Sequence, residues 1–77
     1  MDPRGCLELA SVLMDGLYGD DADFEGFIQA MQNYASWRRR GGFEPMVGDQ
    51  PGDLFYASLG TRYGVLTGNR DAVPDLP

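Results

Sequence analysis

The 77-residue chain contains six arginines and twelve acidic residues, with neither lysine nor histidine, and its net charge is −6. Histidine is the usual proton carrier near neutral pH and lysine a common covalent catalyst, so this composition removes most of the groups that enzymes use. The lone Cys6 excludes an internal disulfide, and without histidine neither a structural zinc site nor an activated thiol is expected. We therefore expect one small domain that is not an enzyme and holds no cofactor or metal.

The negative charge is concentrated in the first half of the chain. Residues 1–37 contain seven acids against one arginine, which leaves a net charge of −6, whereas the five acids and five arginines of residues 38–77 cancel. Such a field repels nucleic acids and favours basic protein surfaces. The candidate partner-binding acids are Glu8, Asp15, Asp20, Asp21, Asp23 and Glu25.

A first helix is predicted near the start of the chain. Asp2 followed by Pro3 is typical of a helix N-terminus, because the carboxylate can cap the first turn and proline fits the first helical position. Apolar residues then recur at helical spacing as far as Leu17. The pattern predicts a helix over about residues 3–18 that is buried on most of its circumference.

A second helix is predicted over about residues 22–40. Asp20 or Asp21 can cap it, and its last turn, residues 38–40, consists of three arginines followed by two glycines, which is a strong stop signal. Residues 1–40 are therefore expected to form an αα-hairpin.

The remaining chain allows two interpretations. A short edge strand is expected within residues 43–47, and the apolar segments 54–59 and 62–67 flank Gly60-Thr61, which fits a type II′ β-hairpin. A helix beginning at Asp53 is the competing interpretation, because Phe55, Leu59, Arg62 and Leu66 fit helical steps. Two interior glycines would cost that helix about 1 kcal/mol each, so the hairpin is favoured.

These elements predict a small α+β domain in which the αα-hairpin packs on a short antiparallel β-hairpin, with an all-α three-helix arrangement as the alternative. Residues 1–70 should form a single compact domain. The segment 71–77, which contains two prolines, should be an extended or disordered tail.

Residues 21–26 match the first half of an EF-hand calcium loop. Asp21, Asp23 and Glu25 supply oxygen ligands at positions 1, 3 and 5, and a glycine stands at position 6. The twelfth position is Gln32 instead of a bidentate glutamate, and the segment already fits a helix. We favour a helix N-terminus with acids near the positive end of its dipole, and keep a metal-sensing module as a minor hypothesis.

The three arginines at residues 38–40 also have two interpretations. They can complement the helix dipole and bond its last carbonyls, or grip phosphates or carboxylates of a partner. Because three successive positions fan out around a helix, we favour the structural role, and we expect only one of them to pair with an acid of the first half.

The chain is rich in aromatic residues for its size, and most of them must lie in the core. Tryptophan and tyrosine are also the types that anchor protein interfaces. The interface candidates are Tyr34, Trp37, Tyr56 and Tyr63; the alternative is that they ring the core with their polar tips in water.

The function predicted from these features is a small acidic protein-binding module. It would dock its acidic face on a basic partner surface and, if that surface normally holds nucleic acid, act as a phage-type inhibitor. The alternative is a structural subunit that forms a homodimer or larger complex through its aromatic surface. No apolar run is long enough to span a membrane and the start lacks the pattern of a secretion signal, so a cytoplasmic protein is expected.

Overall fold

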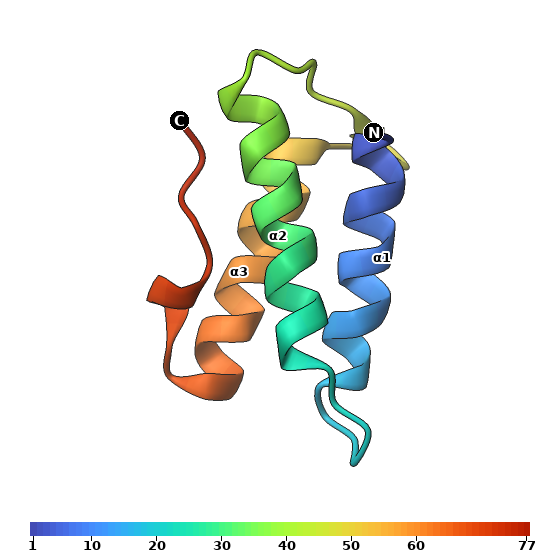
Figure 1. The fold of residues 1–77 in the computed structure, drawn as a ribbon. Helices are drawn as coiled ribbons and strands as arrows, with labels where there is room; N and C mark the ends of the chain where they lie inside the picture. Colours follow the sequence, from blue (N-terminus) through green and yellow to red (C-terminus); the bar gives the residue numbers. More distant parts are fainter.

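The computed structural model describes all 77 residues and contains three α-helices, one two-stranded antiparallel hairpin and one short 3-10 helix (Figure 1). In chain order the elements are α1 (Pro3–Gly16), α2 (Phe24–Arg39), β1 (Met46–Val47), β2 (Gln50–Pro51), α3 (Gly52–Thr67) and η1 (Arg70–Ala72). The predicted α+β class, with an αα-hairpin and a short antiparallel β-hairpin, is confirmed. The molecule measures 35 × 23 × 20 Å.

Helix α1 begins as predicted and ends two residues early. The Asp2 carboxylate accepts a hydrogen bond from the Gly5 N–H at 3.1 Å, so it is the N-cap of the helix. The helix stops at Gly16 because the chain then turns, and the N–H of Leu17 donates to the Met14 carbonyl at 3.1 Å.

Helix α2 is capped by Asp23, whose carboxylate accepts a hydrogen bond from the Gly26 N–H at 2.8 Å. The expectation that Asp20 or Asp21 caps this helix was wrong. Both lie in the turn that connects the helices, whereas Asp23 directly precedes the first helical residue, Phe24, and so forms the cap. The helix ends at Arg39, within one residue of the predicted limit.

The β-hairpin lies earlier in the chain than predicted. Met46 pairs with Pro51 and Val47 with Gln50, and the turn between them contains Gly48 at φ +64°, a conformation that favours glycine. The expected edge strand is therefore present, and it forms one half of the hairpin.

The predicted β-hairpin over residues 54–67 was wrong, because this segment belongs to α3. The buried residues of α3 recur at helical spacing: Tyr56, Leu59 and Tyr63. The two interior glycines that argued against a helix make room for a distant side chain. A Cβ on Gly60 would lie 3.1 Å from the Arg70 guanidinium, and one on Gly64 would lie 3.0 Å from the Cβ of Arg70.

The hydrophobic core lies between the three helices. Its largest fully buried side chains are Leu7 and Met14 from α1, Phe27, Met31 and Tyr34 from α2, and Tyr56 from α3. Two stacked aromatic pairs join α2 to α3: Phe27 with Tyr63, at 5.2 Å between ring centroids, and Tyr34 with Tyr56, at 5.4 Å. Ring pairs of this kind stabilise a fold by about 0.5–1.5 kcal/mol beyond their buried area.

The prediction that the first helix is buried on most of its circumference was wrong. Leu9 and Val12 are 54% and 68% exposed. The fully buried side chains of α1 in the core are Leu7, Ala10 and Met14, and Cys6 and Leu13 beside them are only half-buried.

The C-terminal segment returns alongside α3 (Figure 1). Gly68, at φ +73°, ends α3 in the left-handed conformation. Val73 is buried in the core, and the Tyr56 hydroxyl donates a hydrogen bond to the Pro74 carbonyl. In the segment 71–77, which we expected to be an extended or disordered tail, the first two residues belong to η1 and Val73 packs in the core.

None of the helices combines the length and the apolar composition that crossing a membrane requires. The longest have 16 residues, whereas a spanning helix needs about 20.

Candidate protein-binding site

The six candidate acids divide into two groups. Glu8 and Asp15, on α1, each pair with an arginine: Arg4 Nε lies 3.5 Å from Glu8 Oε2, and Arg62 Nη2 lies 2.9 Å from Asp15 Oδ1. Both pairs are exposed, so each contributes little to stability, but the arginines cancel the charge of these two acids locally.

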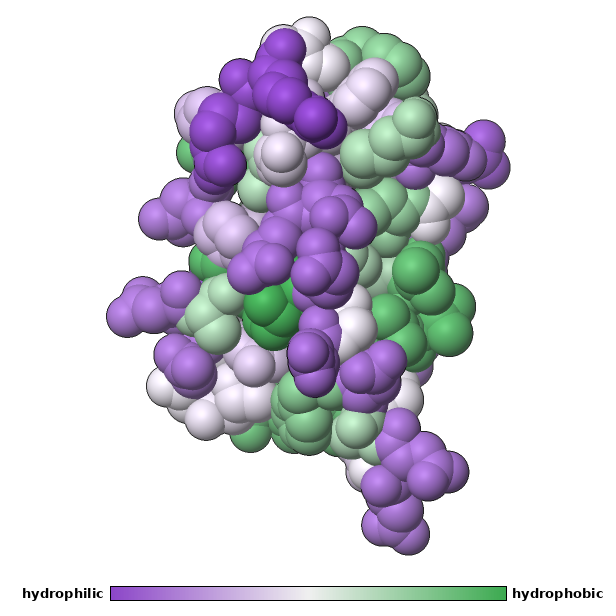
Figure 2. All heavy atoms as spheres, in the orientation of Figure 1, coloured by the Kyte–Doolittle hydropathy of each residue, from purple (hydrophilic) through white to green (hydrophobic).

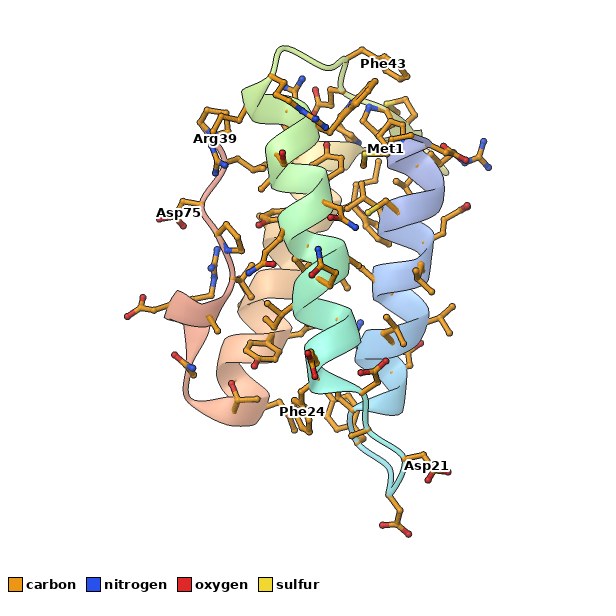
Figure 3. The ribbon with its side chains drawn as sticks, viewed as in Figure 1. Met1, Asp21, Phe24, Arg39, Phe43 and Asp75 are labelled. Atoms are coloured by element: carbon orange, nitrogen blue, oxygen red, sulfur yellow. The ribbon has the colours of Figure 1, made fainter.

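The other four acids lie at one end of the αα-hairpin. Asp20, Asp21, Asp23 and Glu25 occupy the α1–α2 connection and the first turn of α2, and none of them forms an ion pair. Figure 3 shows Asp21 pointing away from the helices at this end. We call these four residues the acidic end. Asp23 has a structural role as well, because it caps α2.

Two exposed aromatic residues adjoin the acidic end. Tyr18, just after α1, is 62% exposed, and Phe24, the first residue of α2, is 41% exposed. The Phe24 ring rests edge-on against Tyr63, with 6.4 Å between centroids, so the core holds one side of it in place. Sequence reasoning did not select either residue as an interface candidate. Their position beside a connection rich in aspartates was the signal that could have found them.

Three of the four aromatic interface candidates lie inside the molecule. Tyr34, Tyr56 and Tyr63 are at most 6% exposed, because the helical spacing of α2 and α3 directs them to the core. A side chain in this position cannot contact a partner. Trp37 is half-buried; its Nε1–H donates to the Phe43 carbonyl at 3.0 Å, and its ring packs edge-on against the exposed Phe43 ring.

A polar network joins α2 to the start of α3. The Asp53 carboxylate accepts hydrogen bonds from the Tyr34 hydroxyl at 2.7 Å, from Arg38 Nε at 3.0 Å and from Arg38 Nη2 at 2.9 Å. Arg38 Nη1 also donates to the Gly42 carbonyl at 2.6 Å. One arginine therefore holds the end of α2, the following loop and α3 together.

This network shifts the pKa values of its members. Burial raises the pKa of Asp53, but the hydrogen bonds from Arg38 and Tyr34 outweigh that effect, and the pKa falls below its ordinary value. Burial, followed by the hydrogen bond to Asp53, raises the pKa of Tyr34. The network thus keeps a charged carboxylate and a neutral phenol, and its role is to hold the structure.

The arginines at the end of α2 behave differently from one another. Only Arg38 forms a salt bridge, as expected, but its partner Asp53 lies in the second half of the chain, not the first. Arg39 and Arg40 are exposed and form no ion pair. Figure 3 shows Arg39 and Asp21 at opposite ends of the molecule.

The calcium-loop resemblance has a local explanation. Asp23 caps α2, and Glu25 belongs to the first helical turn, so the two carboxylates serve the helix N-terminus. The structure contains no convergent group of three acidic or cysteine side chains able to hold a metal ion.

Cys6 faces α2 from α1. Its Sγ donates a hydrogen bond to the Ala30 carbonyl at 3.0 Å, and the side chain is half-buried. Burial raises the pKa of the thiol, which lowers the fraction of reactive thiolate.

Comparisons of the chain with protein-family models, with curated proteins and with solved structures gave no match.

Proposed function

We propose that this chain is a non-enzymatic, cytoplasmic protein-binding module that docks its acidic end on a basic surface of a partner protein. The observation that carries the proposal is the gathering of four acids without ion pairs beside two exposed aromatic rings. Glu8 and Asp15 are matched by arginines, so the acidic end holds four of the five acids of the first half that form no ion pair, the fifth being Asp2.

The two kinds of residue at this end have complementary roles in binding. Unpaired carboxylates attract a basic partner from a distance and set its orientation, mainly by raising the association rate. Tyr18 and Phe24 supply apolar area that a partner can cover, and aromatic anchors of this kind provide much of the affinity of protein interfaces. The acidic end thus combines steering with anchoring on one surface.

The most direct use of such a surface is competition with nucleic acid. A protein that binds DNA or RNA presents lysines and arginines, and an acidic end can occupy them in place of phosphates. The chain would then act as a charge-based inhibitor of the type that phages encode. Its net charge of −6 repels the nucleic acid itself.

The test is capture of partners from the lysate of the native host by the immobilised chain. Asp20→Lys/Asp21→Lys reverses the charge of the acidic end but leaves the Asp23 cap intact. Asp49→Lys/Asp71→Lys is the matched control, because these exposed acids lie elsewhere and the change in net charge is the same. We expect the control to retain the partner and the first variant to lose it. Equal capture by both variants would contradict the proposal.

A structural subunit is the second candidate function. The hypothesis that copies of the chain assemble through an aromatic surface has less support, because Tyr34 and Tyr56 are buried. The observation that favours a different form of it is the exposed apolar row on α1, which includes Leu9 and Val12.

A further inference from the structure

An open groove of about 860 Å³ runs between α1 and α2 on the side away from α3. No residue of α3 lines it. From α1 its wall includes Cys6, Leu9 and Leu13, and from α2 it includes Gln29, Asn33 and Ser36. In Figure 2 the hydrophilic surface lies over α2 in the centre, and hydrophobic surface lies over α1 beside it.

The α1 wall is a second apolar row on a helix that already has one in the core. Leu7, Ala10 and Met14 occupy the buried row. The groove row repeats the same heptad spacing one position earlier: Cys6, Leu9 and Leu13. Cys6 and Leu13 of this row are half-buried against the core, whereas Leu9 is 54% exposed, so the outer side of the row has no neighbour in the chain.

The α2 wall is polar but uncharged in its middle and charged at its two ends. Gln29 Nε2 donates to Asn33 Oδ1 at 3.0 Å, so these amides already satisfy part of their hydrogen-bonding capacity. Asp23 lines the groove near the start of α2, and Arg40 lines it just past the end. Neither residue forms an ion pair within the chain. Asp23 and Arg40 are the caps of α2, so the two charges are separated by about 26 Å along the helix axis.

We propose that a second copy of this chain covers the groove, related by a two-fold axis perpendicular to the helices. This symmetry places α1 antiparallel against α1 and α2 antiparallel against α2. Leu9, near the middle of α1, then meets Leu9 of the other copy, and Cys6 meets Leu13. Arg40 of each copy meets Asp23 of the other, because the axis exchanges the two ends of the groove.

The alternative two-fold axis, parallel to the helices, fits the surface less well. It would stack α1 of one copy on α2 of the other, so that Leu9 and Leu13 would face the amide row of Gln29 and Asn33. Apolar side chains would then desolvate amide groups without supplying hydrogen-bond partners. It would also leave Asp23 without an arginine. We therefore favour the perpendicular axis, because it brings the apolar side chains of the two α1 helices together and pairs Arg40 with Asp23.

This dimer shares only one residue, Asp23, with the acidic end that is proposed to bind a partner. Tyr18, Asp20 and Asp21 do not line the groove, so they stay accessible when it is covered. The dimer would carry two acidic ends that point in opposite directions. Loss of dimerisation and loss of partner capture can thus be observed separately.

The first test measures oligomeric state by sedimentation equilibrium. The wild-type chain should be a dimer, and Leu9→Gln should weaken dimerisation at least about tenfold if this leucine is an anchor. Leu54→Gln is the matched control, because Leu54 is 60% exposed against 54% for Leu9 but lies on α3, outside the groove. Arg40→Glu should weaken the dimer more than Arg39→Glu, since only Arg40 lines the groove.

The second test determines the arrangement of the helices. In a Cys6→Ser background, Leu9→Cys should form an intermolecular disulfide on mild oxidation, whereas Val65→Cys on α3, 83% exposed, should not. A wild-type chain that stays monomeric at its highest soluble concentration overturns the proposal. A dimer that resists Leu9→Gln overturns the assignment of the groove, and a dimer that fails to cross-link at residue 9 overturns the antiparallel arrangement.

Discussion

Replacing Asp53 with alanine should destabilise the domain more than replacing any other acidic residue. Its carboxylate is the only one that accepts hydrogen bonds from two side chains, Tyr34 and Arg38. The substitution would therefore break the connection between the end of α2 and the start of α3 in one step.

The expected loss follows from the burial of the two donors. The Tyr34 side chain is fully buried, and a buried hydroxyl without a partner costs about 1–3 kcal/mol. The Arg38 and Asp53 side chains are 26% and 33% exposed, so water replaces much of the lost ion pair and its contribution is about 1 kcal/mol. Together the loss is about 2–4 kcal/mol, a large part of the 5–15 kcal/mol that is typical of a folded domain.

The assay is urea unfolding followed by Trp37 fluorescence. Asp49→Ala is the control, because Asp49 is exposed and forms no ion pair or side-chain hydrogen bond. Tyr34→Phe removes the hydroxyl itself and keeps the Arg38–Asp53 pair, so it should cost only about 1 kcal/mol. The reasoning is refuted if Asp53→Ala lowers the free energy of unfolding no more than Asp49→Ala does.

The same variants should differ in their dependence on acid pH. The pKa of Asp53 lies below its ordinary value of 3.8 in the folded state, so its stabilising contribution is complete above that pH. The contribution is lost as the pH falls through the folded-state pKa. The gap in stability between the wild type and Asp53→Ala should therefore be constant above about pH 5 and narrow below pH 4.

Three further outcomes follow from the packing. Burial raises the pKa of Tyr56 to about 12, so its ionisation should cost the wild type about 2–3 kcal/mol as the pH rises from 10 through 12. In unfolding curves Tyr56→Phe should lose less stability than the wild type by this amount, and the loss that remains should come from Tyr34, whose pKa is also raised. Gly52→Ala should destabilise the fold by about 1–3 kcal/mol, because the added Cβ would lie 2.8 Å from the Pro45 carbonyl oxygen. Gly16→Ala should not destabilise it, because a Cβ there has no atom within 4 Å, and a lower melting temperature for Gly52→Ala alone would confirm the difference. Cys6 should react with iodoacetamide more slowly in the native chain than in denaturant, and equal rates would show that its burial does not protect it.

The first two helices could be predicted because their signals are local. The cap residues, the apolar spacing and the glycines after the arginines all act within a few positions of the element they define. Even so, the choice of Asp23 over Asp20 and Asp21 as the cap depends on the path of the connecting turn, which the residue types alone do not determine.

Helix α3 could not be predicted with the same rules, because its interior glycines contact a residue that is distant in the sequence. Gly60 and Gly64 resemble turn residues until Arg70 is placed against them by the returning C-terminal segment. The candidate site could likewise be predicted only in part from the sequence. Sequence reasoning named all the acids, but which of them stay unpaired depends on contacts such as Arg62 with Asp15, which lie 47 residues apart.

The central claim is that the acidic end occupies a basic surface that otherwise holds nucleic acid. The most direct measurement captures the partner from host lysate at low salt and then elutes it with duplex DNA or with about 0.5 M salt, where exposed charges are screened within a few ångströms. The account predicts that both treatments release the same protein, and that the Asp20→Lys/Asp21→Lys variant does not capture it. A partner that resists both DNA and salt, or that binds the charge-reversed variant equally well, would contradict the account.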